Sequence, residues 1–327
     1  MTVSIAWVRT IGSCTELLFA SDSRLSGDGR EFDYCPKILA LPRSDCAISF
    51  AGYTGNAYPL IHQLSLAISA SIPLKDRVMD IKALRTHAIK IFDSMADSIQ
   101  TNDNEQKYPT DVTFLFGGYS WVEKKFLIWK IEYSRKAKGF VARPAIHLLF
   151  NATAKKFFLG TLEIAERSSS QDWGLISFAG DQGKNAEKCL IKLLNSRLTS
   201  ASYDARKKID WEPFEVIRDM LRNPAKSHTI DGAPQLVKIY EHLNTQPIAV
   251  AWPSRSSGAV FLQGRPVLEY ENIDSWILDP DTLETFHPKY SQSQLVPAPT
   301  DQAIDKLAET MSCRQRWLHR LRKLFGS

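Results

Sequence analysis

The sequence has few cysteines and no pairing pattern among them. The five cysteines are widely spaced, their number is odd, and no two form a CxxC pair. A disulfide framework or a zinc knuckle is therefore not indicated, and reduced thiols are typical of the cytoplasm. The chain also lacks an N-terminal basic segment followed by an apolar one, and no apolar run approaches the roughly 18 residues that span a bilayer. We therefore expect a cytoplasmic protein without a secretory signal.

A strong excess of charge of one sign and the common cofactor motifs are missing too. The 41 basic and 36 acidic residues leave a net charge of +5, which does not by itself indicate nucleic-acid binding. The seven histidines are scattered, and none lies at metal-ligand spacing from another ligand. The stretch "GDQGKN" has Asn185 where a P-loop has Ser or Thr. We predict neither a metal nor a cofactor.

The hydrophobic pattern changes period along the chain in a regular order. Four strand patterns fill the first fifty residues, and apolar residues at helical spacing follow over 54–71 and 76–99. Strand patterns return at 111–120 and 125–134, two helices are expected at about 184–198 and 213–221, and strands follow to about 262. The pattern predicts an α/β (α+β) fold, namely a four-layer αββα sandwich of two antiparallel sheets flanked by helix pairs.

The pattern ends near residue 265, which predicts a domain over 1–265 with a C-terminal extension. Residues 266–302 are rich in turn formers and are expected to form a linker or a segment draped over the surface. Residues 303–327 have the pattern of a basic amphipathic helix. Three interpretations of that helix remain: packing on the domain, docking a partner subunit, or contact with an anionic membrane surface, for which Trp317 and Phe325 are suitable. No nucleic-acid-binding module is recognisable.

The first ten residues, "MTVSIAWVRT", place a threonine directly after the initiator methionine in a strand pattern. Removal of Met1 would leave Thr2 with a free α-amino group beside its own hydroxyl. Such an amine has a reference pKa of about 7.7–8.0, so a useful fraction is neutral near neutral pH and can accept the hydroxyl proton. One residue then supplies both nucleophile and base. A nearby lysine cation would lower the pKa of the amine further.

Three neighbouring motifs follow in order: "ASDSR" with Asp22 and Arg24, "CPKIL" with Lys37, and "FAGYTGNA" with Gly52. With Thr2, this series resembles the proteasome β-subunit family of N-terminal nucleophile hydrolases, including the simpler bacterial proteasome-like proteases. The likeness covers residues 2–135, is weaker over 174–265 and is absent beyond. Residues 135–172 are an elaboration relative to a minimal family member.

The resemblance implies a role for each matched residue. Thr2 would be the nucleophile and its amine the base. Lys37 would tune that amine, Asp22 would hold Lys37, and the backbone N–H of Gly52 would donate to the oxyanion. Arg24 would support Asp22 or the adjoining loop. Taken singly, these residues also suit ordinary places in turns and at strand edges.

The second half of the chain departs from the family pattern. Asp181 stands where the family has a serine in a Gly-Ser-Gly turn, and His228 and Asp231 lie near the later Asp and Ser-Gly-Gly positions. Asp181 and Asp231 are expected either to accept a hydrogen bond from the Thr2 amine or to be turn residues. The negative charge of these carboxylates would raise the pKa of that amine.

We therefore predict a threonine-type peptidase that cleaves amide bonds in a peptide or protein substrate once Met1 is removed. By analogy with the family it would be a homo-oligomer, and an ATPase partner stays an open question. The alternatives are an inert structural ring subunit of the same fold, an amidase acting on small non-peptide amides, and a scaffold protein that works through its C-terminal segment.

Overall fold

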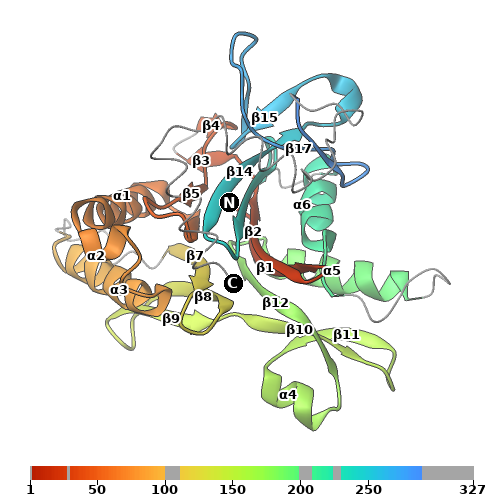
Figure 1. Ribbon diagram of the computed structural model, residues 1–327, viewed down its shortest axis with the longest axis horizontal. Helices are drawn as coiled ribbons and strands as arrows, with labels where there is room; N and C mark the ends of the chain where they lie inside the picture. Colours follow the sequence, from red (N-terminus) through yellow and green to blue (C-terminus); the bar gives the residue numbers. More distant parts are fainter. Residues whose placement is uncertain (1, 28–29, 100–110, 199–207, 224–229, 289–327) are drawn as a thin grey trace, which may run out of the picture. The chain divides into compact units, whose positions relative to one another are not determined.

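The fold is described from a computed structural model of the chain. One compact unit comprises Met1–Thr285, and the second unit, Phe286–Ser327, lies almost wholly outside the described residues. The predicted C-terminal helix and the second half of the predicted linker fall there. The structure describes residues 2–27, 30–99, 111–198, 208–223 and 230–288 (Figure 1).

The larger sheet is built around a hairpin of β1 (Ser4–Ile11) and β2 (Cys14–Ser21), paired in register from Ser4↔Ser21 to Ile11↔Cys14. All of its pairings along the main path are antiparallel. The order is β11 (Lys156–Gly160), β10 (Ile146–Asn151), β12 (Gln171–Ala179), β1, β2, β13 (Gln235–Tyr240), β14 (Asn244–Ala251), β15 (Val260–Leu262) and β16 (Arg265–Pro266).

A second sheet has five antiparallel strands within the described residues. They are β5 (Ile38–Ala40), β6 (Cys46–Gly52), β7 (Val112–Ser120), β8 (Lys125–Ser134) and β9 (Gly139–Pro144). A separate two-stranded arm is formed by β3 (Leu25–Gly27) and β4 (Arg30–Phe32). The helices are α1 (Thr54–Ala70), α2 (Ile72–Lys75), α3 (Ile81–Asp97), α4 (Leu162–Arg167), α5 (Gly183–Arg197) and α6 (Glu212–Arg222), with a 3-10 turn η1 (Arg255–Ser257) and a last strand β18 (Thr285–Phe286).

Alternation along the β1–β2 hairpin places its side chains on two opposite faces. Leu17 and Phe19 of β2 join a cluster with Leu115 and Ile128 of the five-stranded sheet, so this cluster lies between the two sheets. Leu18 and its neighbours of the same face join another cluster with α5 and α6. Because successive strand residues point to opposite faces, the hairpin is buried on both sides.

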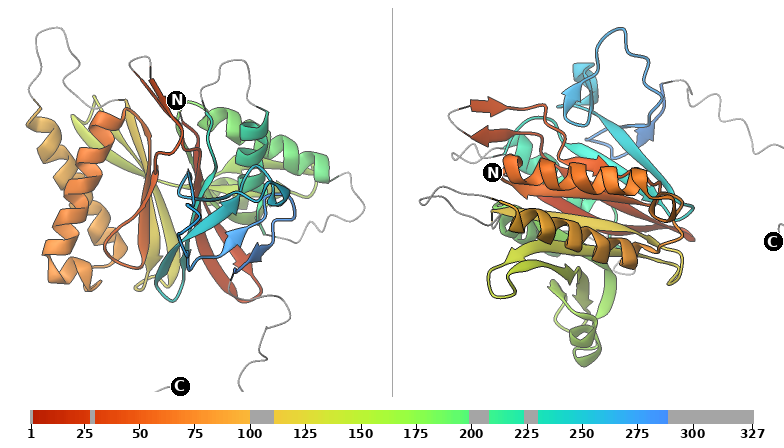
Figure 2. Two further views of the ribbon diagram at one scale, coloured as in Figure 1. Left: turned by 90° about the horizontal axis from the view of Figure 1, so that it is seen from above. Right: turned by 90° about the vertical axis from the view of Figure 1, so that its left-hand side faces the viewer.

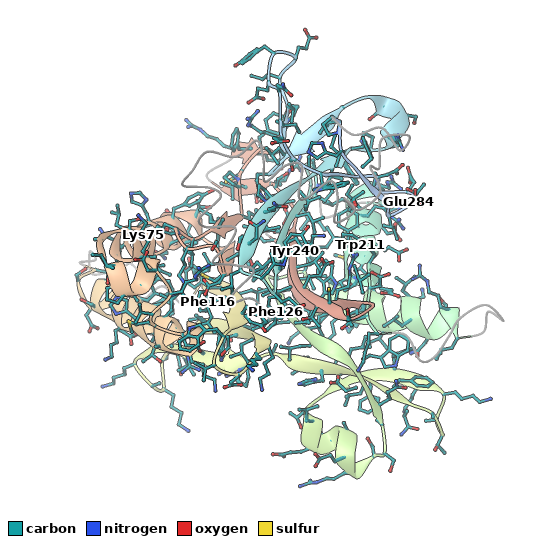
Figure 3. The ribbon with its side chains drawn as sticks, in the orientation of Figure 1. Lys75, Phe116, Phe126, Trp211, Tyr240 and Glu284 are labelled. Carbon is teal, nitrogen blue, oxygen red and sulfur yellow. The ribbon has the colours of Figure 1, made fainter. Side chains whose placement is uncertain are left out.

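The helices cover the outer faces of the two sheets. Apolar residues of α1 and α3 pack against the five-stranded sheet, and those of α5 and α6 pack against the larger sheet. Figure 2 (left) shows α1 and α3 at one side, the strands of both sheets in the middle and α5 with α6 at the other side. Trp211, labelled in Figure 3, precedes α6 and carries the guanidinium of Arg9 at 4.3 Å from its ring centre.

Helices combined with antiparallel sheets confirm the predicted α+β class. Two local predictions differ from the structure. The helix expected over 76–99 begins only at Ile81, because Arg77 has a positive φ of 62° and the Asp80 side chain caps α3 by accepting from the Lys82 N–H. The polar stretch 165–172 reads from the sequence as a loop, but it begins with the last residues of α4, whose N-cap Thr161 accepts from the Ile164 N–H.

The compact unit also extends past the domain boundary expected at residue 265. Beyond that boundary, β17 (Ile277–Leu278) pairs in parallel with β14, and its two residues are buried. A strand of two residues gives no periodic signal, and the surrounding residues are rich in turn formers. The sequence therefore did not predict that β17 belongs to the sheet.

The ring of Phe92 on α3 is fully buried, with ring centres of Phe114 and Phe140 at 5.0 and 5.5 Å. Phe92→Ala should therefore lower the free energy of unfolding by about 3–5 kcal/mol, because it removes packing and leaves a cavity. Urea denaturation would measure it. Leu66→Ala on α1, where the side chain is 48% exposed, is the matched control and should change stability by about 0.5 kcal/mol or less. Equal effects of the two variants would contradict the assigned core.

Candidate active site

The first residues of β1 carry Thr2 onto the inner face of the larger sheet. Ser4 lies on the face turned toward the five-stranded sheet, where its hydroxyl is 2.8 Å from the hydroxyl of Ser49. Thr2 is two residues earlier and therefore shares that face. Its side chain is buried, with 3% of the residue exposed. The strand start thus holds a threonine hydroxyl between the sheets rather than in solvent.

The hairpin register brings Asp22 to the same place. Its backbone N–H donates to Val3 O at 3.3 Å, which continues the ladder past the end of β2. Its side-chain Oδ1 accepts from the Val3 N–H at 3.1 Å. These two bonds fix the carboxyl group beside the residue that follows Thr2.

Lys37 reaches this point from the start of the five-stranded sheet. Its backbone carbonyl accepts from the Phe50 N–H at 3.1 Å, which ties the lysine to β6. Its ammonium Nζ lies 2.9 Å from Thr2 Oγ1 and 2.9 Å from Asp22 Oδ2. Lys37 is therefore in direct contact with both other predicted residues, Thr2 and Asp22, although 35 and 15 positions separate it from them.

The electrostatics of this contact are set by complete burial. Both side chains of the Lys37–Asp22 ion pair have no exposed surface. Burial raises the pKa of Asp22, while the Lys37 cation and the N–H groups of Val3 and Arg24 oppose that rise. A buried ion pair repays its desolvation only when its hydrogen bonds are complete, which makes the whole arrangement sensitive to loss of either partner.

Asp181 and Gly180 hold the backbone of Thr2 from the other side. The Thr2 N–H donates to Asp181 Oδ1 at 2.6 Å, and Thr2 O accepts from the Gln182 N–H at 3.3 Å. Gly180 has a φ of +95°, and a Cβ there would lie 1.9 Å from Thr2 O. Only glycine therefore permits this approach. Asp181 thus accepts from the backbone N–H of Thr2, where a bond from a free amine or a turn position was expected, and the residue is exposed.

Gly52 ends β6 directly before α1. Its φ is +110°, and a Cβ would lie 1.8 Å from the carbonyl oxygen of Asp111. The preceding residue, Ala51, has its Cβ 3.4 Å from the position that a Cβ on Gly180 would occupy. The end of β6 therefore lies beside the turn that holds Thr2.

Asp231 does not make the predicted bond to the Thr2 nitrogen. Its Oδ2 is 3.2 Å from a guanidinium nitrogen of Arg24, and its Oδ1 accepts from the Gly232 N–H at 2.8 Å. The reason is the backbone of this turn, because the Asp231 carbonyl accepts from Ser23 N–H and thereby fixes the carboxylate near Arg24. His228 lies outside the described residues.

Arg24 contacts Asp22 through its backbone and the adjoining loop through its side chain; support of one or the other was expected. Its backbone N–H donates to Asp22 Oδ2 at 3.3 Å, and its side chain binds Asp33 in two hydrogen bonds of 2.6 and 3.0 Å. This pairing holds the pKa of Asp33 below its ordinary value. The arginine thus links the β3–β4 arm to the Asp231 turn.

Gln235 is the site residue that sequence reasoning missed. Its Oε1 accepts from the Lys37 N–H at 2.8 Å, and its Nε2 donates to Asp22 O at 3.2 Å. The residue is 1% exposed, at the first position of β13. The only sequence signal was a polar residue at the edge of an apolar strand pattern. Its amide joins the backbones of the two charged residues.

Comparison with known proteins adds no assignment, because no family model and no curated protein matches the chain. Among the described residues, no group of three or more His, Cys, Asp or Glu side chains is arranged to hold a metal ion. None of the helices in that part of the chain has the length and apolar character needed to cross a membrane.

The buried pair makes a stability prediction. Lys37→Met should lower the free energy of unfolding by about 3–5 kcal/mol, because the Asp22 carboxylate loses its cation in a buried position. Adding Asp22→Asn should recover at least about 1 kcal/mol, since the stranded charge is then removed. Urea denaturation of both variants measures this.

Lys90→Met, at an exposed position of α3, is the matched control and should be nearly neutral. If Lys37→Met proves as stable as this control, the ion pair does not organise the site.

Proposed function

We propose that the protein is an N-terminal nucleophile hydrolase of the proteasome-like type, with an αββα sandwich fold, that cleaves peptide amide bonds with Thr2. The observation that carries the proposal is the 2.9 Å contact of the Lys37 ammonium with Thr2 Oγ1, in a buried position where Asp22 keeps the lysine in place. An ammonium at that distance stabilises negative charge developing on the hydroxyl oxygen.

The reaction requires that Met1 has been removed. The Thr2 nitrogen is then a primary amine, and in its neutral form it accepts the hydroxyl proton. Oγ1 attacks the substrate carbonyl carbon, and the carbonyl electron pair moves to oxygen, toward the Gly52 N–H. The protonated Thr2 amine then gives this proton to the leaving nitrogen as the C–N bond breaks, which returns the amine to its neutral form. Water, deprotonated by the same amine, then cleaves the ester and restores the threonine.

Thr2→Ala should reduce hydrolysis of fluorogenic peptide amides by at least about a thousandfold, because the attacking oxygen is lost. Thr86→Ala, a surface threonine on α3, is the matched control and should keep full activity. Intact-mass spectrometry on each variant would report whether Met1 has been removed.

A covalent label tests the nucleophile without a known substrate. A peptidyl β-lactone should acylate the processed wild-type chain once, with the added mass on Thr2, and should leave Thr2→Ala unmodified. Full hydrolysis by Thr2→Ala, or acylation at another residue, would overturn the proposal.

One observation favours a catalytically inert subunit of the same fold as a second candidate. The Asp181 carboxylate lies 2.6 Å from the Thr2 nitrogen, and a carboxylate at that distance raises the pKa of an amine. The amine would then be mostly protonated near neutral pH and a poor base. Retention of Met1 on the purified protein would likewise support this candidate, since no free amine would exist.

The same contact predicts a pH effect. The base must be neutral, so kcat/KM should rise as pH increases through the pKa of the amine. Asp181→Asn removes the charge that raises this pKa, so the rising limb should move to lower pH by about one unit, a modest shift because Asp181 is exposed. Asp219→Asn on α6, where the carboxylate is also exposed, is the control. An unchanged limb would show that Asp181 does not set the protonation of the base.

The amide substrate is proposed to be a peptide or protein, and small non-peptide amides are the alternative within the same chemistry. Profiling both classes on the processed protein would separate them. Assembly of several copies is part of the proposal by analogy with the resembled family, and sedimentation at equilibrium would measure it.

A further inference from the structure

A cavity of about 500 Å³ lies at the end of the sandwich opposite to Thr2. Thr10 of β1 lines it, and at about 3.3 Å per residue this position is roughly 26 Å along the strand from Thr2. Gly174 and Leu175 of β12 line it as well. The volume is within the range of sites for small ligands, about 300–1,000 Å³. The cavity therefore has no part in the chemistry proposed for Thr2.

The chain passes from one sheet to the other beside the cavity. β9 belongs to the five-stranded sheet and β10 to the larger one, with Ala145 between them. The Ala145 N–H donates to Ile128 O at 2.9 Å, which anchors the crossing on β8. Ala145 lines the cavity and presents only a methyl group to it, so its side chain fills little of the space between the two sheets.

The walls of the cavity are mainly apolar, and its rim is basic. Val8, Leu127 and Leu175 are half-buried and line it from both sheets. The lysines among the lining residues are Lys124 and Lys125 at the β7–β8 turn and Lys208, and all are exposed. Lys125 is paired with Glu123 at 2.8 Å, which leaves the basic character chiefly to the other two.

The acidic residue in the lining, Asp172, is already engaged. Its Oδ1 lies 3.0 Å from His147 Nδ1 and also accepts from the Gly174 N–H at 3.0 Å. Lys208 donates to its backbone carbonyl. The carboxylate is therefore held by the imidazole and by a backbone N–H group. Three lysines stand against this one carboxylate in the lining, so the lining carries an excess of positive charge that favours an anion.

We propose that this cavity binds a small organic acid whose apolar, ring-sized body fills the space between the sheets and whose anionic group faces Lys124 and Lys208. Apolar walls with a few charged groups at the opening suit such a ligand, because the body gains from burial and the acid from the two ammonium groups. The His147 ring lies at the same opening, with its orientation set by Asp172. The proposal does not depend on Thr2 being a nucleophile.

Anilinonaphthalene sulfonate, an aromatic acid that fluoresces when its rings leave water, is a direct probe. The full-length protein should bind it saturably, with one molecule per chain. Lys124→Glu combined with Lys208→Glu should weaken binding at least tenfold. Lys90→Glu, at an exposed position of α3 outside the cavity lining, is a control for the same type of charge reversal and should bind like the wild type. The uncharged analogue phenylnaphthylamine should lose little affinity from the same double substitution.

Ala145→Phe tests the volume independently of charge, because its ring would occupy the cavity, and it should abolish binding. Circular dichroism and thermal melting would establish that each variant is folded, and the charge variants keep the test decisive if Ala145→Phe does not fold. Absence of saturable binding to the wild type, or equal binding by the double lysine variant and the Lys90→Glu control, would overturn the proposal.

Discussion

The ion pair of Lys37 and Asp22 is the constraint on which the rest of the site depends. Both charges are removed from water, so each must be satisfied by the protein. The carboxylate is satisfied by the ammonium and by the Val3 and Arg24 N–H groups. The ammonium, in turn, has Thr2 Oγ1 as a further acceptor. The contacts that satisfy the buried charges therefore also place an ammonium group against the Thr2 hydroxyl.

These contacts join both sheets. Thr2 and Asp22 belong to the β1–β2 hairpin of the larger sheet, whereas Lys37 precedes the first strand of the five-stranded sheet. Gln235 of β13 then binds the backbones of both charged residues. Any sliding of one sheet over the other would separate two opposite charges in an apolar interior, which is costly. The pair therefore fixes the relative position of the sheets around the hydroxyl.

Much of this arrangement was predictable from the sequence because it rests on strong local signals. Period-two alternation in β1 and β2, helical spacing in α1 and the order of the elements indicated an α+β fold. The contacts among Thr2, Asp22 and Lys37 were expected from a resemblance in motif order. What escaped prediction depends on side chains that act at a distance in sequence. The amide of Gln235 bridges residues some two hundred positions away. The hydrophobic periodicity of a sequence does not predict such a long-range hydrogen bond.

The misplacement of Asp231 has a similar cause. The Thr2 amine was expected as its partner because Asp231 lies near a motif position of the resembled family. In the folded chain the carboxylate instead forms an ion pair with Arg24. Short elements such as α4 and β17 were missed because few residues carry their signal, and tertiary contacts decide them. Local pattern therefore predicted the framework, and long-range polar contacts decided the details.

The anchoring of Thr2 has a consequence for the order of maturation and folding. Apart from the bond of the Thr2 N–H to Asp181, the bonds that position it involve its own carbonyl, the Val3 N–H and its side chain, all on the C-terminal side of the Met1–Thr2 peptide bond. Cutting that bond would convert an amide into an amine without releasing any of them. Removal of Met1 would therefore leave these contacts in place and would change only the chemistry of the Thr2 nitrogen.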